Sequence, residues 1–98
     1  MLSCGAAGAL NSFFHTVLEP GDEVLAIAPY FVEYGFYAAN HGGILKTVPC
    51  RKNDFGPDIE AVASAISPRT RALIVNSPNN PSGAVYSAED LRRLAEVL

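Results

Sequence analysis

The sequence predicts an α/β fold, namely a three-layer α/β/α arrangement built around a mainly parallel sheet. Helix-like and strand-like segments alternate along the 98 residues, which is typical of parallel βαβ units. Two of the strand-like segments, residues 23–28 and 72–75, are apolar on both faces. Strands of this kind are covered by helices on both sides of a sheet.

The first quarter of the chain predicts a loop, a helix, a turn and a strand. Residues 3–8 form a loop of small side chains, after which apolar residues at helical spacing predict a helix over residues 8–18. The sequence EPGD, residues 19–22, has proline and glycine where a turn requires them. A short apolar run then predicts the strand at residues 23–28.

The middle of the chain predicts a second helix and a second strand. Residues 29–43 begin with proline and end in two glycines, which fits a helix closed by Gly42. The run ILKTV, residues 44–48, predicts the strand that follows.

The last third predicts two more helices on either side of a third strand. Asp58 precedes a helical apolar pattern and is placed to cap that helix. Residues 72–76 predict the strand, and Ser87 with Asp90 three positions later predicts a capping box for the last helix. The chain ends inside this helical pattern at Leu98, so we expect it to be a segment of a longer protein.

Charge and composition exclude several classes of function. The net charge of −3 gives no basic surface for nucleic acid, and no apolar run approaches a membrane span. Cys4 and Cys50 have neither metal-ligand nor CxxC spacing, and we expect free thiols in a cytoplasmic protein. The sequence predicts no metal site.

Three stretches have residues suited to binding a ligand. The sequence CGAAGAL offers small residues before a helix, an arrangement that suits an anion or simply a tight start to the helix. The sequence APYFVEY puts Phe31 beyond a strand, where aromatic rings serve either as core or as a surface for a planar ligand. The sequence NSPNNPSG has three asparagines that fit a turn or a hydrogen bond to a ligand.

Taken in order with PGDEV, these stretches resemble one known family. The pattern GxxGAL, PGDEV, APYFxxY and SPNNPSGxVY is similar to class I/II aminotransferases of the aspartate aminotransferase superfamily, which are fold-type I pyridoxal-phosphate enzymes. The resemblance covers nearly the whole chain. It implies a fragment of the large cofactor-binding domain, residues 1–98, without the half that carries the catalytic lysine and without the small domain.

The resemblance also implies the cofactor-binding residues. Gly5, Ala6 and Ala7 match the segment whose backbone N–H groups hold the phosphate of pyridoxal 5'-phosphate; a serine or threonine hydroxyl is common in the family at this segment and is missing here. Phe31 matches the aromatic residue that stacks on the pyridine ring, and Asn80 matches the asparagine that hydrogen-bonds the ring hydroxyl O3'.

Two prolines complete the comparison. Pro29 and Pro81 match positions that are commonly cis in the family.

The implied activity is the transfer of an amino group between an amino acid and a 2-oxo acid, in a parent protein that is a homodimer. The family's lysine, which bonds covalently to the cofactor, comes later in the family's order than NNPSG. Neither Lys46 nor Lys52 lies in a matching context, so this chain has no expected catalytic residue and we expect it to be inactive alone.

Other functions stay open at this point. Carbon–sulfur lyases, aminocyclopropane-carboxylate synthases and some decarboxylases share the same motifs. A non-catalytic regulatory α/β module is an alternative of a different class. An unrelated nucleotide-binding domain would use CGAAGAL for a phosphate but leaves NNPSG unexplained.

Overall fold

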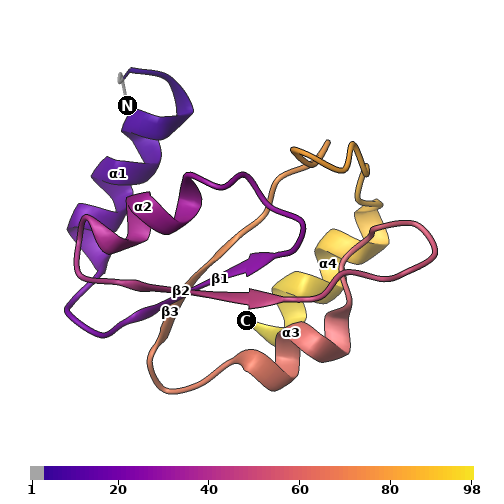
Figure 1. The fold of residues 1–98 in the computed structure, drawn as a ribbon. Helices are drawn as coiled ribbons and strands as arrows, with labels where there is room; N and C mark the ends of the chain where they lie inside the picture. The colour runs from indigo at the N-terminus through magenta and orange to yellow at the C-terminus, as the bar shows by residue number, and fades with distance from the viewer. Residues whose placement is uncertain (1–3) are drawn as a thin grey trace.

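The computed structural model describes residues 4–98 and has the predicted three-layer architecture (Figure 1). Helices and strands alternate in this order: α1 Gly5–Val17, β1 Glu23–Ile27, α2 Tyr34–Ala39, β2 Ile44–Val48, α3 Ile59–Ala65, β3 Thr70–Ile74 and α4 Ala88–Val97. The strands form one parallel sheet in the order β2-β1-β3. The prediction of an α/β fold with a parallel sheet is confirmed.

The two faces of β1 pack against different pairs of helices. Val24 belongs to a core cluster with Phe14 of α1 and Tyr37 of α2. Leu25, the next residue, belongs to a second cluster with side chains of α3 and α4. Because successive side chains of a strand point to opposite faces, β1 joins both cores and is buried throughout most of its length.

The first two helices differ from the sequence prediction. Helix α1 begins at Gly5 rather than at residue 8, so the predicted loop is largely helical; its Ser3 lies outside the described residues. Alanine has the highest helix propensity, which favours an early start. Helix α2 is shorter than predicted and begins only at Tyr34. Its aromatic-rich approach, residues 29–33, has weaker helix propensity and forms a loop.

Strand β3 is displaced by two residues from its predicted position at residues 72–76. Thr70 and Arg71 extend the strand at its start, although they are polar, because both have partners. The Nε of Arg71 donates to the Asp22 carboxylate at 3.1 Å, and the hydroxyl of Thr70 accepts from the Ser67 N–H at 2.9 Å. Asn76 therefore lies in the loop beyond the strand rather than at its end.

The predicted caps and cis prolines are present. The Asp58 side chain accepts from the N–H of Ala61, and Ser87 and Asp90 form the reciprocal capping box of α4. The peptide bonds before Pro29 and Pro81 are cis, as the resemblance implied, and the bond before Pro78 is cis as well. Gly42 has a φ of +80°, a conformation that suits glycine at the end of α2.

Asp90 also links α4 to the loop after β2. Its two carboxylate oxygens accept from the Arg51 guanidinium at 2.8 and 3.1 Å, and Asp54 pairs with the same guanidinium. The hydrogen bonds from Arg51 are the main reason that the pKa of Asp90 lies below its usual value. Because this pKa is lowered, the pair stabilises the fold when the pH is above the ordinary carboxyl pKa. The stabilisation is lost as the pH falls through the pKa of the folded state.

We expect Asp90→Asn to lower the free energy of unfolding at pH 7 by about 2 kcal/mol, because a nearly buried, charge-assisted pair is broken. The difference from the unmodified chain should shrink as the pH falls below the ordinary carboxyl pKa of about 4 and through the lower pKa of Asp90 in the folded chain, because the native carboxylate is then protonated. Urea unfolding of both proteins, at pH 7 and at a pH below the ordinary carboxyl pKa, measures the difference in the free energy of unfolding. Glu96→Gln, which removes an exposed partner of Arg92, is the matched control and should change little. A difference that stays constant with pH would contradict the prediction.

Candidate cofactor site

A pocket of about 430 Å³ lies beyond the carboxyl ends of β1 and β3. Ligands of open α/β sheets bind at this edge, and this volume is within the usual range for small-molecule sites. Its lining comes from the first turns of α1, from the loop after β1, from α2 and from the loop after β3. The residues that line it are Ala6, Ala7, Leu10, Phe31, Glu33, Tyr34, Tyr37, Asn76 and Asn80.

The structure therefore brings together four of the five residues that the sequence singled out. Ala6, Ala7, Phe31 and Asn80 line one pocket, although they come from three separate segments. Gly5 is the residue before Ala6 in the same turn, and an added Cβ there would meet nothing within 4 Å. The loop after β2 lies at the same end of the sheet, because β2 runs parallel to β1, but it does not contribute a lining residue.

The first turn of α1 gives one end of the pocket a positive character. The helix is 13 residues long, and its first turn contains no acidic side chain. Cys4 precedes it without making a side-chain capping hydrogen bond. The N–H groups of a helix's first turn have no carbonyl acceptor within the helix, and its dipole places partial positive charge there. Ala6 and Ala7 thus form a wall that suits an anion.

Aromatic rings form another part of the lining. The Phe31 ring stands edge-on to Tyr34, with 5.8 Å between the ring centroids, so Tyr34 supports its orientation. Tyr37 donates its hydroxyl hydrogen to the Glu33 carboxylate at 2.5 Å. This bond is the main cause that raises the pKa of Tyr37, and burial raises the pKa of Tyr34. Both phenols are therefore protonated at neutral pH.

Asn80 lines the pocket, and its backbone is fixed by the side chain of Asn76. Its N–H donates to the side-chain oxygen of Asn76 at 2.8 Å. The side chain of Asn80 carries two amide hydrogens that are able to donate to an oxygen on a ligand. Asn76, which the sequence placed at a strand end, is therefore both a lining residue and a support for Asn80.

Sequence reasoning missed part of this wall. The sequence favours Tyr34 and Tyr37 as core and interface aromatics; both are buried, and both also line the pocket. Glu33 was not singled out. The four-residue spacing of Glu33 and Tyr37, which places them on one helical face, is the signal that could have found the pair. Phe36, the third aromatic side chain of α2, does not line the pocket and is 67 % exposed.

The lysines lie elsewhere. The Nζ of Lys46 donates to the Ala65 carbonyl at 2.9 Å, on the side of α3. Lys52 lies in the exposed turn after β2. Neither is among the lining residues.

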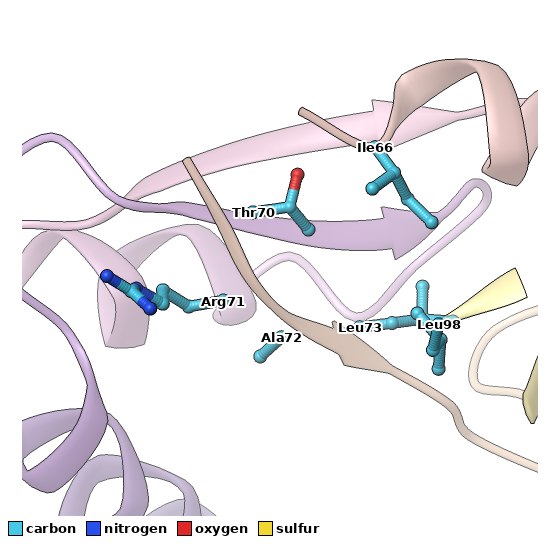
Figure 2. A pocket seen from close by; sticks show the side chains of 6 residues that line it. All are labelled: Ile66, Thr70, Arg71, Ala72, Leu73 and Leu98. Carbon is cyan, nitrogen blue, oxygen red and sulfur yellow. The ribbon is translucent and has the colours of Figure 1, made fainter. Parts of the chain in front are cut away.

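A smaller pocket of about 240 Å³ runs along β3 (Figure 2). Its lining comes from β3, from Ile66 after α3 and from Leu98 after α4. The charged side chain on it, Arg71, is paired with Asp22. Because this lining has no aromatic ring and no uncommitted charge, the larger pocket is the better candidate.

Residues 4–98 show neither a metal cluster nor a disulfide. In this part of the chain no group of three or more histidine, cysteine, aspartate or glutamate side chains is placed to hold a metal ion. Cys4 and Cys50 are free thiols, as predicted. No helix in the same range has the length and apolar character that a membrane span needs.

The family model for aminotransferase class I and II matches residues 1–98. The chain belongs to this family. An aspartate/prephenate aminotransferase from Thermus thermophilus is 45 % identical over 100 residues, covering 99 % of this chain and 26 % of the relative. An aspartate aminotransferase from Geobacillus stearothermophilus is 43 % identical over 94 residues, covering 95 % and 24 %. The chain thus spans about a quarter of the length of these curated relatives.

Solved structures of the family agree with the fold. The N-succinyldiaminopimelate aminotransferase of Mycobacterium tuberculosis superposes with a TM-score of 0.92 at 42 % identity, covering 97 % of this chain and 25 % of that structure. The Thermus thermophilus aspartate aminotransferase with maleate gives 0.87 at 48 % identity, covering 91 % and 24 %. The chain therefore has the fold of a part of these aminotransferases.

Proposed function

We propose that this chain is part of a pyridoxal-phosphate-dependent aminotransferase, which moves an amino group between an amino acid and a 2-oxo acid. Residues 1–98 then belong to the large cofactor-binding domain, and the lysine-bearing half and the small domain lie outside this segment. The observation that carries the proposal is that Ala6, Ala7, Phe31 and Asn80 line one and the same pocket in a chain of the aminotransferase family.

The chemistry of the pocket fits the cofactor. A helix N-terminus suits a phosphate dianion, an aromatic face suits a pyridine ring, and an amide N–H suits the oxygen of the ring hydroxyl. The pocket contains one group of each kind, at α1, at Phe31 and at Asn80. With only glycine and alanine at residues 5–7, the phosphate is held by backbone N–H groups rather than by a side-chain hydroxyl.

Pyridoxal phosphate supplies an electron sink for the negative charge that develops on the α-carbon of the amino acid. The residues of this chain bind and orient. Ala6 and Ala7 hold the phosphate, and Phe31 covers one face of the ring. The amide of Asn80 donates to the ring oxygen and thereby favours its ionised form. We assign no catalytic residue to this chain and expect it to be inactive alone.

Relatives with three different substrate names match at similar identity, so the proposal stays at the level of an amino acid and a 2-oxo acid. A lyase, a cyclopropane-carboxylate synthase or a decarboxylase of this fold would use the same pocket. The names of the relatives favour the aminotransferase.

We further propose that the whole protein is a cytoplasmic homodimer. Free cysteines suit a reducing compartment. Val32, just before α2, and Phe36 of α2 are 70 % and 67 % exposed, and exposed apolar side chains of this kind suit an interface.

Binding of deoxypyridoxine phosphate tests the proposal. This probe has the ring, its hydroxyl and the phosphate but no aldehyde, so it does not react with lysines. We expect the unmodified chain to bind it and Asn80→Ala to bind it about five- to tenfold more weakly, because one hydrogen bond is lost. Calorimetric titration measures both affinities.

Asn53→Ala is the matched control, since Asn53 is exposed and lies in the turn after β2, away from the pocket. It should bind like the unmodified chain. An unmodified chain that does not bind the probe would sink the proposal, and equal affinities of the Asn80 and Asn53 variants would remove the role given to Asn80.

A further inference from the structure

Asn79 differs from the two asparagines on either side of it. It is only 8 % exposed, whereas Asn80 is exposed and Asn76 is half-buried. Asn79 is not among the residues that line the pocket, so it does not face a ligand there. A buried side-chain amide needs hydrogen-bond partners, and those of Asn79 are informative.

The amide of Asn79 joins two of the loops that line the pocket. Its Nδ2 donates to the Pro29 carbonyl at 2.9 Å and to the Ser82 hydroxyl at 2.8 Å. An amide group has two hydrogens, which matches these two acceptors. Pro29 lies two residues before Phe31, and Ser82 lies two residues after Asn80. One side chain therefore connects the Phe31 loop with the Asn80 loop.

The backbone around Asn79 is fixed as well. Its N–H donates to the Ala84 carbonyl at 2.8 Å, and its own carbonyl accepts from Gly83 at 2.7 Å. On the other side, the N–H of Asn80 donates to the Asn76 side chain at 2.8 Å. Asn80 is thus held by the Asn76 side chain and, through the preceding residue, by the carbonyl of Pro29.

We propose that Asn79 is a positioning residue that sets the separation between the ring-stacking Phe31 and the amide of Asn80. This inference rests on the proposed function, because it concerns the same pocket. Asn79 acts on the ligand through Asn80: without its amide, the loop after β3 is no longer tied to Pro29, and the Asn80 donor is displaced from the ring oxygen. Phe31 and the α1 N-terminus lie outside this loop and are retained.

Two probes separate positioning from general stabilisation of the fold. Deoxypyridoxine phosphate carries the ring hydroxyl, and its analogue without that hydroxyl keeps the ring and the phosphate. The ratio of the two affinities reports the hydrogen bond from Asn80 alone. We expect the unmodified chain to prefer the hydroxyl-bearing probe about five- to tenfold, and Asn80→Ala to lose this preference.

Asn79→Ala should also lose the preference while binding the analogue without the hydroxyl as the unmodified chain does. The double variant Asn79→Ala with Asn80→Ala should be no worse than Asn80→Ala alone, because effects through one donor are not additive. Asn53→Ala, exposed and distant from the pocket, should keep the full preference. If Asn79→Ala does not fold, as judged by circular dichroism, Asn79→Asp replaces it, since it has nearly the same volume but no N–H for the Pro29 carbonyl.

Each other outcome overturns the inference. A variant of Asn79 that keeps the preference shows that the amide does not position Asn80. Equal weakening towards both probes shows a role in the fold alone. If the unmodified chain binds neither probe, the proposed function fails, and the inference fails with it; binding of both probes without preference removes the role of Asn80 but leaves the phosphate site.

Discussion

Replacement of Ala7 by glutamate is expected to weaken the binding of a phosphate-bearing ligand strongly. Ala7 lies in the first turn of α1 and lines the pocket. A carboxylate a few ångströms from a phosphate dianion costs several kcal/mol at the effective dielectric of a protein surface, so affinity for deoxypyridoxine phosphate should fall by at least about a hundredfold. The same carboxylate stabilises the helix by about 0.3–1 kcal/mol, because it opposes the positive end of the dipole.

Two comparisons isolate the charge. Ala7→Gln has nearly the same size without the charge and should weaken binding much less. For the unphosphorylated probe, both variants should lose affinity by a similar amount, and this loss should be smaller than the loss of the glutamate variant for the phosphorylated probe. Calorimetric titration of each variant with each probe measures the affinities, and urea unfolding measures the stability of each variant. Equal losses in the glutamate and glutamine variants would show a steric effect and no anion site at α1.

The second large effect concerns stability. Leu25, at the centre of β1, is fully buried in the cluster shared with α3 and α4. Leu25→Ala removes three buried carbon atoms and leaves a cavity, so the free energy of unfolding should fall by about 2–5 kcal/mol. Urea unfolding followed by circular dichroism measures the change.

Leu91→Ala is the matched control, because Leu91 of α4 is 43 % exposed and has less apolar surface to lose. Its effect should stay below about 1 kcal/mol. Similar losses in the two variants would contradict the assignment of β1 as the shared centre of both cores.

The layered fold was predictable because its signals are local or periodic. The apolar run of β1, the Asp58 cap and the capping box of Ser87 and Asp90 each lie within a few residues, and the structure contains all of them. The boundaries of β3 were not predictable, because Thr70 and Arg71 join the strand through partners distant in sequence or outside the apolar pattern.

The candidate site, like the fold, was predictable from the sequence only in part. Local chemistry left the three asparagines of NSPNNPSG equivalent, and the resemblance singled out Asn80. The structure gives each a different environment: Asn76 supports the backbone of Asn80, Asn79 reaches the Pro29 carbonyl, and Asn80 lines the pocket. The contact between Asn79 and Pro29 spans fifty residues of sequence, and no pattern in a single sequence encodes such a pair.

The loops at the two ends of β1 and β3 are fastened by different kinds of bond, an ion pair at the amino-terminal ends and a hydrogen bond between uncharged groups at the carboxyl ends. At the amino-terminal edge the buried carboxylate of Asp22 is paired with Arg71 and lies 3.9 Å from Arg69. At the carboxyl ends of β1 and β3, the amide of Asn79 joins the two loops by donating to the Pro29 carbonyl. Dissolved salt weakens the ion pair only in part, because Asp22 is buried while Arg71 is half exposed, and it hardly affects a hydrogen bond between uncharged groups. The bond that joins the Phe31 loop to the Asn80 loop should therefore be insensitive to ionic strength.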